Sequence, residues 1–255
     1  MFDGLITSGY DVAELAVDAF TLFFIGLVFY LRREDRREGY PLEVDTSDEQ
    51  ENHGAVWLPE PKKFLLEDGR TIEAPSHKRE GRTFAMERLS IWPGSPYEPT
   101  GNPLVDGVGP AAYAEREDVP DRGFGGHNKI VPMSNLDDFF VVASDPDPRG
   151  MAVIGADGNR AGTVSDLWVD HGEQLIRYLE VTLEAGGKVL LPMPFATVKG
   201  GQRQVKVRAI LASQFEQVPQ VKTPGEVTRR EEDAICAYYA GGLLYATPQR
   251  AEPVL

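Results

Sequence analysis

Five charged or titratable side chains lie within twelve residues of one another: Asp166, Asp170, His171, Glu173 and Arg177. They follow a β-rich run and flank a glycine, so a strand–turn–strand junction would bring them within hydrogen-bonding reach. Such a cluster could accept and pass protons, because imidazole titrates near neutral pH and neighbouring charges shift carboxylate pKa values. The alternative is a solvated turn with a surface ion pair, which is a common and weak arrangement.

Motifs for other chemistry are absent from the sequence. It contains no phosphate-binding glycine loop, no Gly-x-Ser-x-Gly elbow and no His-Glu-x-x-His motif. The four histidines, His53, His77, His127 and His171, are far apart, which disfavours a compact metal site. The single cysteine, Cys236, excludes an intramolecular disulfide, a Cys-rich zinc site and a chain-held iron–sulfur cluster. Proton handling remains, and His127 in its glycine-rich run is either a second candidate for it or an ordinary loop residue.

Short β-rich runs separated by turn residues surround the charged cluster and would position it. In chain order they are Phe139–Ala143, Met151–Gly155, Ala161–Val169, Leu175–Leu183, Val189–Val198 and Val205–Leu211. Their spacing of about ten residues is typical of a small antiparallel β-barrel. Alternation along the fourth run puts Arg177 on the apolar face of Leu179 and Val181, so we expect an acidic partner for this arginine.

Helix, hairpin and loop signals lie on either side of these runs. A helix is expected over Val227–Tyr239, ending at Gly241-Gly242. The Asp68-Gly69 turn predicts a hairpin within Lys63–Ile72. Ile91–Pro110 holds five prolines and four glycines, which argue against any helix or central strand. That segment is predicted to be irregular, and either mobile or laid along a partner's surface.

The N-terminal region contains an uncharged apolar run of 13 residues, Ala19–Leu31. At about 1.5 Å per residue the run covers about 20 Å of a roughly 30 Å hydrocarbon core, whereas extension back to Val12 gives a full span. Four arginines within Arg32–Arg37 follow it, so the positive-inside rule places Met1 outside and the bulk of the chain in the cytoplasm. A secretory signal peptide and the buried helix of a soluble domain are the alternatives, disfavoured by the missing basic leader and the abrupt arginine cluster.

Acidic residues mark one face of this predicted transmembrane helix. Asp11, Glu14 and Asp18 are spaced so that they share a helix face. A carboxylate inside the bilayer is costly unless it faces a protein partner, so this face predicts contact with neighbouring membrane helices. Tyr30 falls at the opposite membrane interface, where its ring suits lipid headgroups.

The overall composition is that of an acidic globular protein. The 255 residues carry a net charge of −14, and their mean hydropathy of −0.30 excludes a polytopic membrane protein. No long Lys/Arg stripe is available for phosphates, so a nucleic-acid partner is not expected. Nine of the fourteen net negative charges lie in the first 60 residues. The remaining −5 is ordinary for a soluble domain.

Five stretches spread over nearly the whole chain form a distinctive set. They are Tyr30–Leu42 (YLRREDRREGYPL), Pro99–Pro110 (PTGNPLVDGVGP), Asp147–Gly150 (DPRG), Asp166–Asp170 (DLWVD) and Tyr238–Pro248 (YYAGGLLYATP). In order and in sequence, this set resembles the H subunit of the purple bacterial photosynthetic reaction centre. The resemblance implies a single N-terminal transmembrane α-helix, a mainly β cytoplasmic domain of the PRC-barrel type, and a C-terminal helix.

The same resemblance implies a location and a domain order. The protein would cross the bacterial inner membrane, in its intracytoplasmic or chromatophore form, once, with a periplasmic N-terminus. The expected segments are a periplasmic N-terminus at 1–11, a transmembrane helix at 12–31, an extended cytoplasmic region at 32–135, a PRC-barrel-like β domain at 136–225, and a C-terminal helix and tail at 226–255.

By resemblance the chain is a non-catalytic subunit that caps the L and M subunits. Those partners would hold bacteriochlorophyll, bacteriopheophytin, quinones and non-haem iron, and this chain would bind no cofactor itself. A cytochrome subunit, a light-harvesting ring and membrane lipids are further candidate partners. Family members shield the secondary quinone from water and supply part of its proton path, which requires linked titratable groups in a dry interface.

Site residues are carried over by position. Glu173 matches a carboxylate near the quinone pocket, Asp170 an acid beside it, and Arg177 a base that balances their charge. These three roles rest on the resemblance rather than on spacing.

His127 matches the second histidine of a surface loop that some members use for proton uptake. In this sequence Gly125 stands at the position of the first histidine and Gly123 at that of an acid. The departure puts a paired-imidazole site in question, so Asp121 and other surface acids are alternative proton collectors.

Two other functions remain open from the sequence. One is a membrane-tethered PRC-barrel adaptor that docks soluble or RNA-processing partners. The acidic helix face and the Pro/Gly-rich segment disfavour it, because both indicate an intramembrane partner. The other is a membrane-anchored hydrolase that uses Asp170 and Glu173, for which the sequence holds no nucleophile or metal motif.

Overall fold

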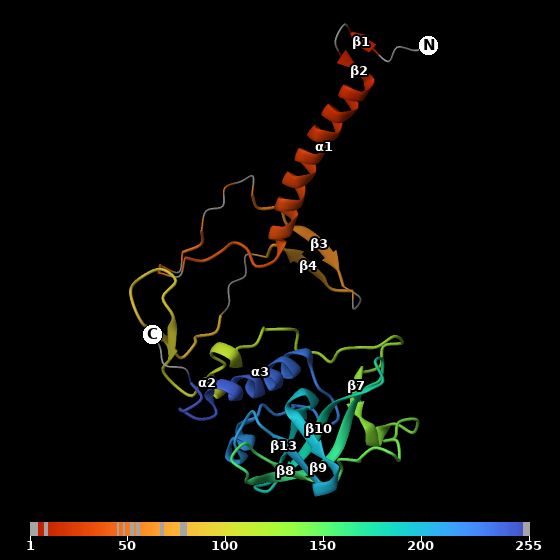
Figure 1. Cartoon of the computed structure of the whole chain (residues 1–255), viewed down its shortest axis with the longest axis vertical. Helices are drawn as coiled ribbons and strands as arrows, with labels where there is room; N and C mark the ends of the chain where they lie inside the picture. Colours follow the sequence, from red (N-terminus) through yellow and green to blue (C-terminus); the bar gives the residue numbers. More distant parts are fainter. Residues whose placement is uncertain are drawn as a thin grey trace. The chain divides into compact units, whose positions relative to one another are not determined.

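The computed structural model describes residues 5–7, 10–44, 46–47, 49–51, 54, 57–66, 69–76 and 81–251 (Figure 1). Two compact units make up the chain: Met1–Arg82 with Ser90–Pro96, and Thr83–Leu89 with Tyr97–Leu255. His53, His77 and parts of the predicted N-terminal segment 1–11 and C-terminal tail lie outside the described residues.

A long helix, α1 (Val12–Glu34), dominates the first unit (Figure 1). It follows a short strand pair, β1 (Leu5–Thr7) and β2 (Tyr10–Asp11), and leads into a 3-10 turn at Asp35–Arg37. No residue of α1 is buried within the chain, although the helix is long and apolar enough to cross a membrane. The helix predicted from Val12 is therefore confirmed, and the alternative of a buried helix in a soluble domain fails.

The start of α1 is closed by a capping box. The Asp11 carboxylate accepts from the Glu14 backbone N–H at 2.8 Å, and Glu14 accepts from the Asp11 N–H at 3.2 Å. Two otherwise unpaired backbone donors are thereby satisfied. At the other end, Arg32 and Arg33 lie in the last turn, where cations complement the helix dipole.

A β-hairpin is attached to the C-terminal end of α1. Strands β3 (Lys62–Leu65) and β4 (Thr71–Ala74) pair antiparallel, which confirms the predicted hairpin, while Asp68 of its turn lies outside the described residues. Arg37 donates to the Ala74 carbonyl at 2.9 Å, and Lys62 lies 2.8 Å from Glu34. These contacts connect the hairpin to the helix end.

The second unit is built on a seven-stranded sheet in the order β11-β10-β9-β8-β13-β12, with β7 also paired to β9. Its strands are β7 (Ile130–Pro132), β8 (Ala152–Ile154), β9 (Arg160–Asp170), β10 (Leu175–Leu183), β11 (Lys188–Pro192), β12 (Ala196–Lys199) and β13 (Gln204–Val207). Alternate inward side chains, such as Leu167, Leu179 and Val205, are fully buried. The mainly β domain is confirmed, and the parallel pairing of β8 with β13 departs from the all-antiparallel expectation.

Three of the predicted strands differ from the observed ones. Residues 139–143 form no strand, because an apolar run needs a neighbouring strand to pair with and Phe140 is exposed here. The predicted run Val189–Val198 is two strands separated by a 3-10 turn at Met193–Phe195, where Pro192 and Pro194 cannot donate to a ladder. The last run, predicted to reach Leu211, ends at Val207.

Arg177 does not share the buried face of β10 as predicted. Ile176 lies opposite Val169 and Tyr178 lies opposite Trp168, so Arg177 is the extra residue of a β-bulge and is exposed. A bulge shifts the alternation by one residue, which explains the error.

The Pro/Gly-rich segment contains more regular structure than predicted. Strand β6 (Tyr97–Pro99) pairs with β5 (Met86–Arg88), and a one-turn helix, α2 (Pro103–Asp106), precedes a 3-10 turn at Gly109–Ala111. The helix forms because Asn102 caps it, Pro103 stands at its first position and Gly107 ends it at φ 66°.

The C-terminal helix, α3 (Arg229–Tyr245), begins at the capping box of Thr228 with Glu231. It was predicted to stop at Gly241-Gly242, and it continues through both. A Cβ on Gly241 would lie 2.6 Å from Ala111 Cβ, and one on Gly242 would lie 2.6 Å from the Ala209 carbonyl oxygen and against Ile210. The two glycines therefore permit close packing rather than ending the helix.

This packing predicts that Gly242→Ala destabilises the second unit. The added methyl group has no room between α3 and Ala209, so the free energy of unfolding should fall by about 1–3 kcal/mol. Gly201→Ala is the matched control, because nothing lies within 4 Å of its Cβ position. Denaturant unfolding in detergent measures both variants. Equal stabilities would contradict the assigned packing.

Candidate functional site

The turn between β9 and β10 carries the charged cluster. Asp170, the last residue of β9, is completely buried. One of its carboxylate oxygens, Oδ1, accepts from the backbone N–H groups of Gly172 at 3.0 Å and Glu173 at 2.9 Å. The Gln174 N–H donates to the Asp170 carbonyl at 2.8 Å. These bonds close the turn over the carboxylate and fix its orientation.

Lys129 reaches this turn from the residue before β7. Its Nζ lies 3.2 Å from Glu173 Oε1 and 3.3 Å from Asp170 Oδ2, an oxygen that accepts no hydrogen bond of standard geometry. The side chain of Glu173 is half exposed, at 50%, whereas that of Lys129 is 25% exposed. The contacts with Glu173 and Asp170 raise the pKa of Lys129 above its ordinary value. One ammonium therefore serves two carboxylates of very different burial.

Two imidazoles lie beside this cluster. The ring centroids of His127 and His171 are 5.1 Å apart in an edge-to-face arrangement, and Phe139 lies 5.3 Å from His171. The backbone N–H of His171 donates to the backbone carbonyl of Lys129 at 2.8 Å. A pair of exposed imidazoles thus adjoins the residues that bind the buried carboxylate. The second imidazole of this pair therefore comes from the β9–β10 turn and not from position 125.

The glycine-rich loop folds around His127. The Gly123 N–H donates to the His127 carbonyl at 2.9 Å, and the Gly126 N–H donates to the Gly123 carbonyl at 3.0 Å. A Cβ on Gly123 would lie 3.0 Å from His127 Nε2. Gly125 and Gly126 both have positive φ angles. The glycines that replace the expected acid and first histidine therefore allow the loop to close on the remaining ring.

Arg177 lies in a different electrostatic environment from the one expected. Among the described residues, the cation within ion-pair distance of Asp170 and Glu173 is Lys129. Burial raises the pKa of Glu232, and a 2.8 Å hydrogen bond from Tyr178 and the charge of Arg177 offset part of that rise. The role of Arg177 in balancing charge at a quinone pocket stays a prediction.

Asp121 is held by α3. Its Oδ1 accepts from Arg229 at 2.6 Å, and this hydrogen bond is the main reason why the pKa of Asp121 lies below its ordinary value. Its carbonyl accepts from the Lys129 N–H at 2.8 Å. Asp121, the alternative proton collector, therefore forms an ion pair with α3, and its backbone carbonyl holds the residue that follows the His127 loop.

Asp166 is not part of the cluster. Its carboxylate accepts from Ser134 at 2.6 Å and from the Leu167 N–H at 2.8 Å. It lines a separate pocket of about 440 Å³ together with Glu180 and Lys188. Burial opposes ionisation of Glu180, but the hydrogen bonds from Lys188 and neighbouring groups hold its pKa below the ordinary value.

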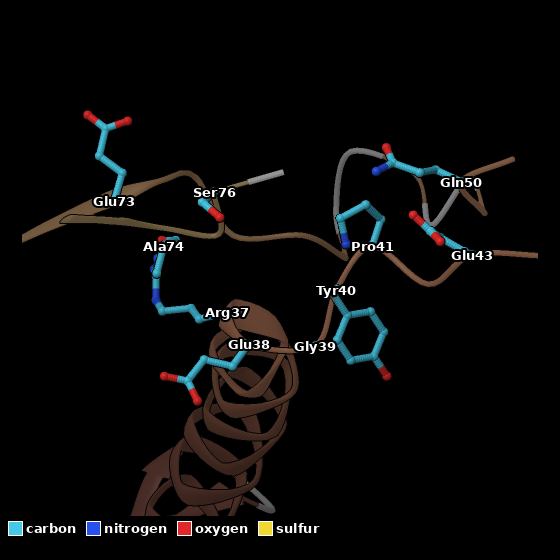
Figure 2. Close-up of a pocket in the computed structure, with 10 residues that line it drawn as sticks. All are labelled: Arg37, Glu38, Gly39, Tyr40, Pro41, Glu43, Gln50, Glu73, Ala74 and Ser76. Atoms are coloured by element: carbon cyan, nitrogen blue, oxygen red, sulfur yellow. The ribbon is translucent and has the colours of Figure 1, made fainter. Parts of the chain in front are cut away.

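A further hollow, of about 350 Å³, lies in the first unit where the chain leaves α1 (Figure 2). It is lined by Arg37, Glu38, Gly39, Tyr40, Pro41, Glu43, Gln50, Glu73, Ala74 and Ser76. Figure 2 shows the Arg37 side chain directed at Ala74, whose carbonyl it binds. The guanidinium is also paired with Glu34 at 2.8 Å. This hollow surrounds a structural arginine, and we assign no chemistry to it.

The residues predicted to face partner helices or lipid lie at the start of α1 and along it. Asp11 and Glu14 bond each other's backbone in the capping box, so part of their capacity is used locally. Asp18 lies on the exposed surface of α1, and Tyr30 is 55% exposed near its C-terminal end. Contact of the acids with partner helices and of Tyr30 with lipid stays a prediction.

The fold and these features define a single-pass, membrane-anchored protein with a mainly β domain and a cluster of charged side chains at the β9–β10 turn. The chain matches the family described as photosynthetic reaction centre, H-chain N-terminal region, over residues 4–135. It matches the PRC-barrel domain over residues 140–214. The chain therefore belongs to the photosynthetic reaction centre H-chain family, which confirms the resemblance.

Membership of this family has direct consequences. The H chain is a structural subunit of the reaction centre, and it associates with the L and M subunits. The cofactors of the reaction centre sit in those partner subunits. Within the described residues, no three or more His, Cys, Asp or Glu side chains are grouped to hold a metal ion.

Neither the position of Lys129 nor the proximity of His171 to His127 was predicted from the sequence. Lys129 is 44 residues from Glu173 in the chain, and its position depends on the pairing of β7 with β9. A three-residue strand with little alternation gives a weak signal. The Ile-Val-Pro sequence of β7, which follows the glycine-rich loop, was the one available indication of a strand at this place.

Removal of the Lys129 ammonium is predicted to destabilise the second unit. In Lys129→Met the buried Asp170 keeps two backbone hydrogen bonds but loses its cation, so the free energy of unfolding should fall by about 1–3 kcal/mol at pH 7. Because the pKa of Lys129 is raised in the folded state, this stabilisation is present below the ordinary lysine pKa of about 10.4 and is lost as the pH rises above it.

The control is Lys63→Met, which removes an exposed ion pair with Glu73. That variant should change stability by at most about 0.5 kcal/mol. Unfolding curves at pH 7 and above pH 11 measure both. A Lys129→Met variant as stable as the Lys63→Met variant at pH 7 would refute the role given to Lys129.

Proposed function

We propose that this chain covers the cytoplasmic side of the L and M subunits and conducts protons toward the secondary quinone held there. The observation that carries the proposal is a set of linked titratable groups of increasing burial. His127 and His171 are exposed, Glu173 is half exposed, and Asp170 is completely buried. Such a gradient is what a path from bulk water into a dry interface requires.

The contacts of Glu173, Lys129 and Asp170 suggest a separate role for each in proton conduction. Glu173 is the carboxylate that exchanges protons, since it is both reachable from water and bound to Lys129 at 3.2 Å. Lys129 stabilises negative charge at the mouth of the path without itself losing a proton near neutral pH. We assign Asp170, the buried carboxylate held by the turn N–H groups, to the inner end of the same path.

Uptake from water is assigned to the two imidazoles. Imidazole is the side chain that binds and releases protons near neutral pH. The His127–His171 pair lies next to Lys129 through the backbone bond of His171, so a proton collected there is close to Glu173. Arg177, together with Glu232, would set the electrostatic potential on the neighbouring strand.

The membrane arrangement follows from charge. The arginines at the end of α1 favour a cytoplasmic location for that end and a periplasmic one for residues 1–11. The face of Asp11, Glu14 and Asp18 would contact helices of L or M, and Tyr30 would contact lipid headgroups. A cytochrome subunit and a light-harvesting ring are further partners consistent with this placement in the bacterial inner membrane.

Replacement of Glu173 by Gln is predicted to slow proton delivery. The amide keeps the size of the side chain but cannot carry a proton, so proton-coupled transfer of the second electron to the quinone should slow by about tenfold or more. Primary charge separation should be unchanged, because it involves no proton uptake. Flash-induced absorption kinetics on the purified complex measure both steps.

Glu184→Gln is the matched control, because Glu184 is a comparably exposed carboxylate that pairs with Arg160 away from the cluster. Near-infrared pigment bands of normal shape establish that each variant complex has assembled. Normal second-electron kinetics in Glu173→Gln would remove this residue from the path.

The two histidines are predicted to substitute for each other. Because the rings are 5.1 Å apart, His127→Gln or His171→Gln alone leaves an imidazole at the same place. Each single variant should slow proton uptake less than the double variant does. pH-indicator dye measurements after a flash give the uptake rate. A double variant with unchanged uptake would move the collecting site to other surface acids.

A further inference from the structure

The β3–β4 hairpin has an apolar face that the described part of the chain leaves largely uncovered. Phe64 lies directly opposite Ile72, and Lys62 lies opposite Ala74. Alternate residues point to the same side of a strand, so these four side chains share one face. Phe64 is 42% exposed and Ile72 is 46% exposed. A two-stranded sheet cannot cover such a face by itself.

Contacts within the first unit fix this face relative to α1. Lys62 Nζ lies 2.8 Å from Glu34, in the last turn of the helix. Arg37 donates to the Ala74 carbonyl at 2.9 Å and to the Glu60 carbonyl at 3.0 Å. Figure 1 draws the hairpin at the C-terminal end of α1. The face that bears Lys62 and Phe64 is therefore the one joined to the end of the membrane-spanning helix.

We propose that this face lies on the lipid surface, with Phe64 and Ile72 in the boundary between headgroups and acyl chains. The arginines of the last turn of α1 mark the edge of the hydrocarbon core, and the hairpin is joined to the residues that follow them directly. Aromatic and aliphatic side chains next to lysines are typical of interfacial elements, since lysine stems extend toward the headgroups.

The open strand edges limit how deep the hairpin can lie in the membrane, and its charge favours lipid as the partner that covers the apolar face. Among the described residues no third strand pairs with the hairpin, and the backbone groups left unpaired at its strand edges exclude it from the hydrocarbon core but not from the hydrated headgroup layer. The basic side chains of Arg32 and Arg33 lie at the helix end, and that of Lys62 lies on the proposed face of the hairpin. A surface of anionic phospholipid complements this charge. The inference requires only that α1 spans the membrane, and it does not depend on proton conduction.

Nitroxide labels at matched positions test the orientation. Phe64→Cys and Leu65→Cys are made in a Cys236→Ser background, and the labelled reaction-centre complex is reconstituted into vesicles of phosphatidylcholine and phosphatidylglycerol. The two positions are adjacent on β3 and point to opposite faces. We expect the label at 64 to be relaxed more by dissolved oxygen than by a water-soluble nickel chelate, and the label at 65 to show the reverse.

The opposite strand provides a repeat of the comparison. Ile72→Cys should behave as Phe64→Cys does, and Thr71→Cys should behave as Leu65→Cys does, because each pair is cross-strand. Labels at 64 and 72 that are open to the nickel chelate would place this face in water and overturn the proposal. Labels immobilised and shielded from both reagents would show that a protein partner covers the face, which would also overturn it.

Discussion

The pairing of β7 with the end of β9 is the constraint on which the charged site depends. Ile130 lies opposite Asp170, so the preceding residue, Lys129, is placed beside the β9–β10 turn. From there its carbonyl binds His171 and its ammonium meets both carboxylates. A slip of one residue would send alternate side chains to the other face of the sheet. Asp170 would then be a fully buried carboxylate without a cation, which is a costly state.

Elements with strong local patterns were predictable from the sequence. Strand β10 has the predicted bounds, and α1 starts at the predicted residue, because β10 is a β-rich run between two turn sequences and α1 contains a long apolar run. The family resemblance was also readable from local blocks. The role of a glycine was harder to predict, since glycine is common both at helix ends and where a helix packs closely against a neighbour. Gly241 and Gly242 serve the second purpose in α3, which only the position of Ala111 and Ala209 reveals.

The candidate site was predictable in part. Asp170, His171 and Glu173 are neighbours in sequence, so the turn alone brings them together. Lys129 and His127 reach the same place from 44 residues away through strand pairing, which composition and spacing do not encode. Arg177 is a contrasting case. Its face was misjudged because the bulge in β10 interrupts the alternation, and among the described residues the cation paired with Asp170 and Glu173 is Lys129.

The glycines of the His127 loop are consistent with a second imidazole that comes from another part of the chain, and not from position 125 as the family resemblance implied. Gly125 has a φ angle of +95°, a conformation that residues with a side chain rarely adopt. A histidine at this position would therefore strain the loop in its present form. The ring that approaches His127 comes instead from the β9–β10 turn, where His171 is fixed by its backbone bond to Lys129. The imidazole pair is thereby joined to the carboxylates by the same strand pairing that places Lys129.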